Sequence, residues 1–256
     1  MSDHAPNQTE ANRAHFNEAA SSYNNRFEKT ILQIIHEIQE RREWLGVDWV
    51  EDSSEDESST SNSKGATRPV RLLDYACGTG LVSRALAPYV SQCVGIDLTE
   101  GMAAEYNKSM ENQGIPASEM FAHVGNLIDP SDPSPAAFTG PEFHDFDIAA
   151  VGLGFHHFDN PALAAKRLAE RLKPGGVLFI IDFQPHEHVH GHHHAAEKSV
   201  THMGFSEVDI KKMFEEAGVG KGFEHVVVGK GIVITDKSDK MKTVTREVFM
   251  ARGSKL

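Results

Sequence analysis

Apolar positions recur at steps of three and four residues in the first part of the chain, between residues 10 and 46. The clearest group shares one face at helical spacing and comprises Phe27, Ile31, Ile34, Ile35 and Ile38. This pattern predicts an amphipathic helical segment. The following segment, 51–68, is acidic and serine-rich, and it has too few apolar groups to offset the cost of ordering. We therefore expect an N-terminal helical cap (1–50), a flexible linker (51–68) and a core (69–256).

From residue 69 onwards, short apolar runs alternate with helical periodicity. Seven runs are typical of strands: 70–76, 93–97, 120–124, 146–151, 177–182, 223–228 and 247–252. Helix signals lie between them, at Glu100 to about Asn107, from the pair Asn160-Pro161 to Leu172, and from Ser206 to Gly218. Alternation of this kind predicts an α/β fold, with a mostly parallel sheet covered by helices on both faces.

The segment from Leu72 to Leu81 predicts a strand, a turn of small residues and the start of a helix. Gly78 and Gly80 can adopt positive φ, and small side chains let the backbone approach a ligand closely. The helix start offers unpaired N–H groups. Asp97 ends the next short strand, where a carboxylate is placed to accept from ribose hydroxyls. Together these features predict a nucleotide-binding site.

An acid inside the turn narrows the choice of ligand. Dinucleotide sites carry G-x-G-x-x-G over a pyrophosphate, which a carboxylate would repel. Asp74 suits a ligand with an ammonium group instead. The spacing Asp74-x-Ala76-x-Gly78-x-Gly80 resembles motif I, D-x-G-C-G-T-G, of the class I S-adenosylmethionine-dependent methyltransferases, especially the small-molecule subgroup with the ubiquinone/menaquinone methyltransferases. Ala76 departs from the first glycine of that motif.

The resemblance covers residues 69–252 and includes the LKPGG run at 172–176. It implies a Rossmann-like sheet of seven strands with the last one antiparallel, and S-adenosyl-L-methionine as the cofactor. In the family, the acid and backbone of the turn hold the methionine end of the cofactor. Those positions here are Asp74, Ala76, Gly78 and Gly80. Asp97, with Leu98 beside it, would bind the ribose; the alternative is that Asp97 caps the helix that follows, and both roles can hold at once.

The resemblance implies further cofactor contacts. Asn126 and Leu127 follow the third strand, where the family often has an acid that receives the adenine amino group. The Asn126 oxygen can still accept, its amide can donate to a ring nitrogen, and Leu127 can pack on the adenine face. The alternative is an ordinary asparagine turn. Gly152 would line the reactive end of the cofactor, and Tyr23 would either cover the cofactor or belong to the core.

Two histidines, His156 and His157, follow the fourth strand in a pattern that resembles the apolar–His–His ending of the family motif. A neutral imidazole can take a proton from a hydroxyl, thiol or amine near pH 7. We expect the two rings to face different ways, so that at most one points into the pocket as a catalytic base. The alternative is that they shape the loop through hydrogen bonds to the backbone.

Composition limits the partners and leaves several functions open. The net charge of −12 over 256 residues argues against nucleic acid, because phosphate binding needs a basic face. Cys77 and Cys93 fit reduced thiols, and no apolar run approaches the ~18 residues of a membrane span. The hypotheses are methyl transfer to a small molecule at O, N, S or C, methyl transfer to a protein side chain in an acidic groove, and non-catalytic cofactor binding by a regulatory subunit.

Two features stand outside these motifs. Six histidines lie between residues 186 and 194 and favour a solvated polar loop, a contribution to the substrate pocket, or a metal site, although their spacing fits no closed zinc site. The tripeptide Ser254-Lys255-Leu256 matches the peroxisomal import address. It predicts an import receptor as partner and a peroxisomal location; the alternative is coincidence in a cytoplasmic protein.

Overall fold

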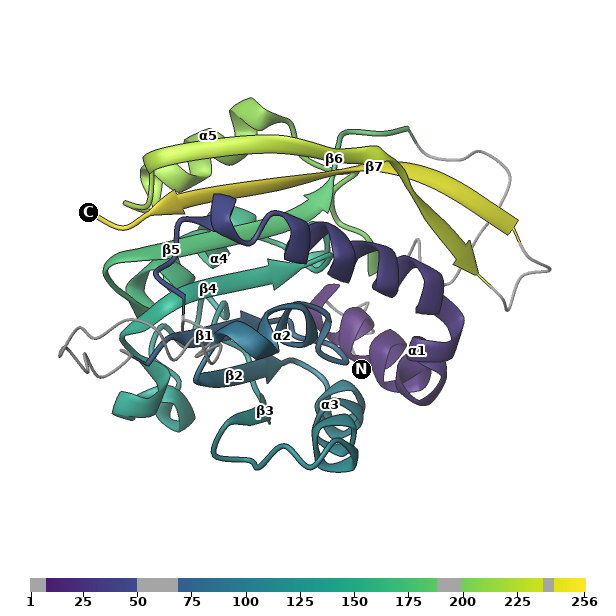
Figure 1. Ribbon diagram of the computed structural model, residues 1–256, viewed down its shortest axis with the longest axis horizontal. Coiled ribbons are helices and arrows are strands. Elements are labelled where there is room, and N and C mark those ends of the chain that lie inside the picture. The colour runs from purple at the N-terminus through teal and green to yellow at the C-terminus, as the bar shows by residue number, and fades with distance from the viewer. Residues whose placement is uncertain (1–7, 50–68, 188–198, 237–241) are drawn as a thin grey trace, which may run out of the picture.

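A seven-stranded sheet forms the centre of the computed structural model, which describes residues 8–49, 69–187, 199–236 and 242–256 (Figure 1). The strand order is β3-β2-β1-β4-β5-β7-β6. The strands are β1 (Arg71–Tyr75), β2 (Gln92–Asp97), β3 (Met120–Val124), β4 (Phe146–Gly152), β5 (Leu172–Phe183), β6 (Lys221–Asp236) and β7 (Lys242–Ser254). The predicted linker lies outside the described residues.

Strand directions match the prediction. The pairs β1–β2, β1–β4, β2–β3 and β4–β5 are parallel, and β7 runs antiparallel to both β5 and β6. The Rossmann-like α/β class with an antiparallel last strand is therefore confirmed. The chain moves from β1 to β2 on one side and returns to β4 on the other. The carboxyl ends of β1 and β4 thus form a switch point, where open α/β sheets bind ligands.

Helices cover both faces of the sheet (Figure 1). They are α1 (Gln8–Glu40), α2 (Leu81–Leu86), α3 (Glu100–Asn112), α4 (Pro161–Arg171) and α5 (Glu207–Glu216). Because side chains alternate along a strand, neighbouring residues enter different cores. Leu72 is buried in a cluster with Leu86 of α2, whereas Leu73 is buried in a second cluster with Leu168 of α4 and Phe214 of α5.

Local signals place α4 correctly, and a long-range pairing changes the start of β5. The Asn160 side chain accepts from the Leu163 amide at 2.9 Å and caps α4 as its sequence predicts. β5 begins at Leu172 rather than at the predicted Val177, because Leu172 already pairs with Phe146 of β4.

The last two strands are longer than their apolar pattern predicts. β6 and β7 stay paired on both sides of an irregularity between Val228 and Ile232, where the register shifts. The hairpin runs alongside α1 (Figure 1). Ile34 and Ile38 of α1 are buried in the same cluster as Val228 and Ile232, so the helix packs directly on the hairpin.

α1 is interrupted at Phe27, whose φ of −110° and ψ of 17° are not helical. After the break, the helix buries Ile31, Ile34 and Ile38. Before it, the buried residues are Asn12 and Ala20. Apolar burial therefore anchors the second half of α1 more strongly than the first. No helix among the described residues combines the length and apolar character needed to cross a membrane.

One side chain closes the outer edge of the sheet at the middle of β3. The Ala122 amide donates to Asn107 Oδ1 at 2.8 Å, and the Ala122 carbonyl accepts from Asn107 Nδ2 at 2.9 Å. Asn107 lies on α3, which extends to Asn112 and so beyond its predicted end. Its amide takes the place of a neighbouring strand at this position.

Candidate functional site

The turn after β1 lies at the switch point, and its small residues leave much of its backbone uncovered by side chains. Ala76, Gly78 and Gly80 all have positive φ, of 52°, 52° and 90°. A Cβ added at Gly78 would meet no atom within 4 Å, whereas one at Gly80 would lie 2.9 Å from the Tyr106 ring. A ligand can therefore approach the backbone at Gly78, while Gly80 is required for packing. Ala76 adopts the left-handed conformation that the family glycine would adopt without strain.

Asp74 is buried beneath this turn, with 1% of its surface exposed. Its Oδ2 accepts from the Ser83 amide at 3.0 Å and from Ser83 Oγ at 2.6 Å. Ser83 is in the first turn of α2, whose N-cap is Gly80, so Asp74 caps the helix from the neighbouring strand. Burial raises the pKa of Asp74 to about 7. Direct contact between Asp74 and a cofactor ammonium group stays a prediction.

Asp97 joins the tip of β2 to the turn. One oxygen accepts from the Gly78 amide at 2.8 Å, and the other accepts from the amide and hydroxyl of Thr99 at 2.9 and 2.8 Å. Burial raises the pKa of the Asp97 carboxyl. The N-cap of α3 is Thr99, so the alternative in which Asp97 caps that helix is wrong. Leu98 is half-buried at the same tip, and ribose binding at this pair stays a prediction.

The first half of α1 covers the turn. Asn24 Oδ1 accepts from the buried Thr79 hydroxyl at 2.6 Å. Tyr23 packs on Phe27 with ring centroids 4.9 Å apart. Burial, together with the charge of Asp97, raises the pKa of Tyr23. Tyr23 directly precedes Asn24 on this half of α1, and whether it covers the cofactor or belongs to the core stays a prediction.

The same half-helix reaches two further elements. Asn17 Oδ1 accepts from the Gly101 amide at 2.8 Å at the start of α3. Asn12 Nδ2 donates to the His157 carbonyl at 2.9 Å, and the Phe16 ring meets the His157 ring edge-on at 5.0 Å. Polar contacts from one helix thus span the carboxyl ends of β1, β2 and β4.

Asn126 is held by a residue that sequence reasoning missed. Its Oδ1 accepts from the Tyr75 hydroxyl at 3.1 Å and from the Ile128 amide at 2.9 Å, and the Tyr75 oxygen accepts from the Leu127 amide at 3.2 Å. Both lone pairs of the Asn126 oxygen are used. Its Nδ2 has no acceptor in the described part of the chain, so it can donate to a ligand nitrogen. Leu127 is 1% exposed within the core, and its contact with a cofactor stays a prediction.

The end of β4 packs against the glycine turn. A Cβ at Gly152 would lie 2.6 Å from a methyl carbon of Val82, and one at Gly154 would lie 3.1 Å from the Ala76 Cβ. Leu153 between them has a φ of 55°, and its amide donates to the Ile181 carbonyl at 2.9 Å. Close packing and positive φ are concentrated where the predicted reactive end of the cofactor lies.

A buried carboxylate fixes His156. Asp182, at the end of β5, accepts from the His156 amide at 3.1 Å, from the Phe183 amide at 2.7 Å and from His156 Nδ1 at 2.8 Å. Asp182 is fully buried and His156 is 6% exposed. Because the carboxylate oxygen accepts this hydrogen bond, Nδ1 donates it, and in the neutral imidazole this leaves the lone pair on Nε2. Sequence reasoning missed Asp182, since an acid at a strand end carries no local signal of its partner.

His157 lies beside His156, with ring centroids 4.0 Å apart. Both residues lie in a 3₁₀ turn, Phe155–His157, and their Nδ1 atoms reach different partners; that at most one ring points into the pocket stays a prediction. His157 Nδ1 donates to the Ser199 carbonyl at 2.6 Å. Burial, and then the neighbouring His156, lowers the pKa of His157 well below its usual value. His157 is therefore neutral near pH 7.

Most of the histidine-rich segment lies outside the described residues. His186 is described: its Nδ1 donates to the Gln184 carbonyl at 3.0 Å, and burial lowers its pKa. No group of three or more metal-ligating side chains occurs among the residues that the structure describes. The three alternatives for the segment stay open.

The terminal tripeptide is bonded to the end of the sheet. Ser254 ends β7, and Lys255 Nζ donates to the Leu172 carbonyl at 2.7 Å. The Lys255 backbone exchanges hydrogen bonds with Gly175 and Gly176 at 3.0 and 2.9 Å. Leu256 is 83% exposed.

Comparison with known proteins gives a consistent family. A family model described as a methyltransferase domain matches residues 25–219. An uncharacterized methyltransferase of Schizosaccharomyces pombe is 30% identical over 168 residues, 64% of this chain and 58% of that protein. A ubiquinone/menaquinone biosynthesis C-methyltransferase of Hydrogenovibrio crunogenus is 30% identical over 115 residues, 44% of this chain and 41% of that protein. The chain spans 58% or less of the length of these curated relatives.

Solved structures share the fold. A chain from the complex between the Haloferax volcanii Trm112 methyltransferase activator and the putative methyltransferase has a TM-score of 0.60 at 16% identity; the match covers 93% of this chain and 96% of that one. A putative methyltransferase of Bacillus halodurans has a TM-score of 0.52 at 23% identity; the match covers 73% of this chain and 93% of that one.

Proposed function

Since the chain belongs to the class I S-adenosylmethionine-dependent methyltransferases, we propose that it transfers the methyl group of S-adenosylmethionine to a small organic acceptor at O, N, S or C. The observation that carries this proposal is the junction at Gly78. The Gly78 amide donates a hydrogen bond to Asp97, while the space that a Cβ at Gly78 would occupy is open. The similarity to methyltransferases of ubiquinone biosynthesis supports a small acceptor.

The described residues fit the cofactor. The open side of Gly78 gives room for close backbone approach, and Asn126 Nδ2, which has no acceptor among the described residues, provides a donor for an adenine ring nitrogen. Asp97 lies between them at the tip of β2 and would accept from the ribose diol. When bound, S-adenosylmethionine supplies a methyl group activated by its positively charged sulfur.

The protein mainly has to align the acceptor with the methyl group and exclude water. Alignment supplies about 7–11 kcal/mol of barrier lowering in well-oriented reactions. The first half of α1 excludes water by lying across the strand ends at Asn12, Asn17 and Asn24. In the neutral imidazole, Asp182 holds the proton on Nδ1, so His156 Nε2 would take a proton from an acceptor that arrives protonated.

Transfer to a protein side chain is the second candidate, favoured by the net charge of −12, which would attract basic peptides. The contacts of α1 across the site favour the small acceptor instead. A regulatory subunit without catalysis is the third candidate.

Radiolabelled cofactor separates the three functions. We expect label to pass from S-adenosyl-[methyl-³H]methionine to low-molecular-weight material of a cell extract. Label on protein bands would favour the second candidate, and cofactor binding without any transfer would favour the third.

A matched pair of variants tests the site. Asp97→Ala should abolish cofactor binding by calorimetry while the circular dichroism stays unchanged. Asp159→Asn, on an exposed loop, should bind normally. Unchanged cofactor affinity in Asp97→Ala would contradict the site assignment.

We also propose that Ser254-Lys255-Leu256 directs the protein to peroxisomes, with a cytoplasmic location as the alternative. A fluorescent protein fused before residue 1 should enter peroxisomes, and removal of Leu256 from that fusion should keep it cytosolic. Cytosolic fluorescence of the intact fusion would refute the address. Such a result would be understandable, because Lys255 is already bonded to Leu172 and Gly176.

A further inference from the structure

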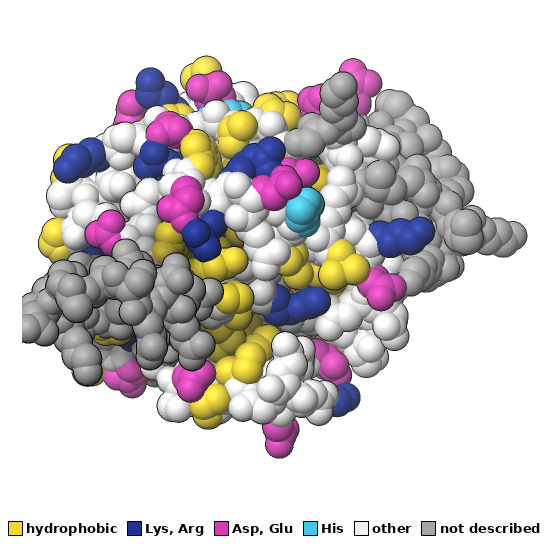
Figure 2. Space-filling model, viewed as in Figure 1, with side chains coloured by type: hydrophobic (Ala, Val, Ile, Leu, Met, Phe, Trp, Pro, Cys, Tyr) yellow, Lys and Arg dark blue, Asp and Glu magenta, His cyan; other side chains and the backbone are white. Residues whose placement is uncertain are grey.

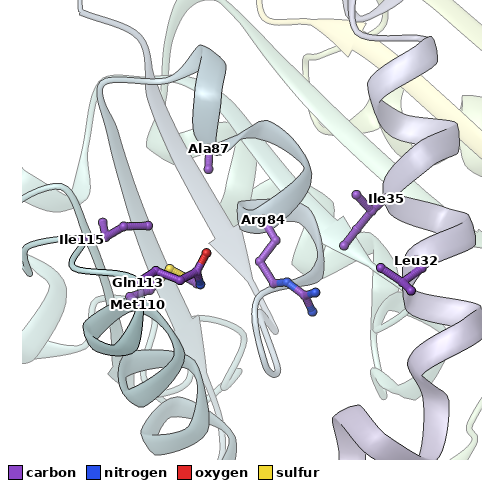
Figure 3. Close-up of a pocket in the computed structure, with 7 residues that line it drawn as sticks. All are labelled: Leu32, Ile35, Arg84, Ala87, Met110, Gln113 and Ile115. Atoms are coloured by element: carbon purple, nitrogen blue, oxygen red, sulfur yellow. The ribbon is translucent and has the colours of Figure 1, made fainter.

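A groove lies between α1, α2 and α3, and it consists of two adjoining cavities. The first has a volume of about 220 Å³ and is lined by Leu32, Ile35, Arg84, Ala87, Met110, Gln113 and Ile115 (Figure 3). The second has a volume of about 310 Å³ and is lined by Asn24, Asn25, Glu28, Ile31, Leu32, Arg84, Ser109 and Gln113. Leu32, Arg84 and Gln113 belong to both cavities. Together the two cavities have the size of a site for a small organic ligand.

The two ends of this groove differ in polarity. Beyond the three shared residues, the first cavity is lined only by apolar side chains. The second adds amide, hydroxyl and carboxylate groups, from Asn24, Asn25, Glu28 and Ser109. Figure 2 shows the face that carries α1, α2 and α3, where apolar side chains gather beside single basic ones. A ligand that fills the groove must therefore be apolar at one end and polar at the other.

Arg84 lies where the two ends meet. Figure 3 shows its side chain extending from α2 into the space between α3 and the Leu32 and Ile35 side chains of α1. In the described part of the chain, its guanidinium has no hydrogen-bond or ion-pair partner. An arginine against apolar walls favours an anionic group, above all a planar carboxylate that accepts two N–H bonds. The negative charge of Glu28 at the polar end keeps such a group on the Arg84 and Gln113 side.

We propose that this groove binds a small amphiphilic carboxylate of the medium-chain fatty-acid class. The carboxylate pairs with Arg84 and accepts from the Gln113 amide. The hydrocarbon tail lies against Ile35, Met110 and Ile115. Leu32, which is 53% exposed, becomes covered.

The position of the groove couples it to the cofactor turn. Asn24 lines the polar end and also accepts from Thr79 in the turn, while Leu32 follows the break of α1 at Phe27. The ligand contacts α1 at Leu32 and Ile35, just after the break, and so restrains the helix from which Asn24 reaches the turn. Binding of the carboxylate and of the cofactor product S-adenosylhomocysteine should strengthen each other, because linkage is reciprocal.

Sodium decanoate, below its micelle concentration, is the probe. Decanol represents the tail alone and acetate the head alone. In protein labelled with ¹³C-methyl methionine, decanoate should shift the Met110 resonance saturably. Decanol should do so more weakly, and acetate should not. An unshifted Met110 resonance would overturn the site.

Variants separate the two ends of the groove. Arg84→Gln should weaken decanoate binding about tenfold or more, because a hydrogen bond to a charged group is lost, and should leave decanol binding unchanged. Ala87→Leu should weaken both ligands by filling the apolar end. Arg167→Gln, on α4 at the other face of the sheet, is the control and should bind as wild type. Equal decanoate affinity in Arg84→Gln and Arg167→Gln would overturn the role of Arg84.

Coupling is read by calorimetry with S-adenosylhomocysteine, which is independent of methyl transfer. Saturating decanoate should raise the affinity of the wild-type protein several-fold and that of Arg84→Gln not at all. An unchanged affinity in wild type would refute the coupling. Failure of decanoate to bind leaves the proposed methyl transfer untouched, because no acceptor takes part in these measurements.

Discussion

The pair formed by His156 and Asp182 gives the sharpest prediction. Replacing Asp182 by Asn keeps the shape of the side chain but turns one acceptor into a donor. In the wild-type protein, the Asp182 carboxylate accepts from the His156 amide, the Phe183 amide and His156 Nδ1. An amide in its place leaves one of these donors without an acceptor in a fully buried position. The expected loss in free energy of unfolding is about 1–3 kcal/mol.

The Asp182→Asn substitution should also change the tautomer of His156. When the new amide nitrogen faces His156 Nδ1, that nitrogen becomes the acceptor and the proton passes to Nε2. A base with a protonated Nε2 cannot accept a proton from the substrate. The rate constant kcat should therefore fall by about 10²–10⁴-fold, the usual contribution of a general base, while KM changes little.

Two measurements test this reasoning. Nitrogen-15 spectra of histidine-labelled protein should show the Nδ1-protonated tautomer of His156 in wild type and its loss in Asp182→Asn. Initial rates of methyl transfer should fall in Asp182→Asn but not in the exposed control Asp159→Asn. A folded Asp182→Asn protein that keeps wild-type kcat would refute the role given to the pair.

Three further substitutions have defined outcomes. Ala76→Gly should raise the free energy of unfolding by about 1 kcal/mol in urea denaturation, because φ is positive at this residue; a lower value would contradict the strain argument. Burial raises the pKa of Asp74 to about 7, so between about pH 4 and pH 7 the folded state holds a proton that the unfolded state has lost. Stability should fall as pH rises through this window, by at most about 1.4 kcal/mol per pH unit, and Asp74→Asn should flatten that dependence; an identical slope in both proteins would exclude Asp74 as its source. Tyr75→Phe removes the acceptor of the Leu127 amide and one donor to Asn126. It should lower the free energy of unfolding by about 1–3 kcal/mol and weaken S-adenosylhomocysteine binding. An unchanged affinity by calorimetry would show that Asn126 does not need the Tyr75 hydroxyl.

The sequence predicts those parts of the structure that depend on local pattern. The continuous apolar run that includes Leu72 and Leu73 predicts a strand buried on both faces, and small residues predict the turn at Gly78. Asn160 predicts the start of α4 through its own side chain. In each case the atoms that decide the structure lie within a few residues of one another.

The parts that the sequence did not predict depend on contacts between distant residues. Tyr75 reaches Asn126 across 51 positions, and Asp182 reaches His156 across 26. Neither side chain has a local signature that names its partner. The length of β6 was missed for a related reason: the glycines between Val228 and Ile232 suggest a turn, but pairing with β7 turns them into an irregularity inside one long strand.

The Asn107 side chain has a consequence for solubility. An exposed sheet margin is a template for other polypeptides, and here its middle position is already saturated from within the same molecule. An incoming chain would have to break two bonds at Ala122 before it made any there. The Asn107 side chain thus protects the edge strand from pairing with a second molecule. Asn107→Ala would leave the Ala122 backbone unpaired and should favour self-association.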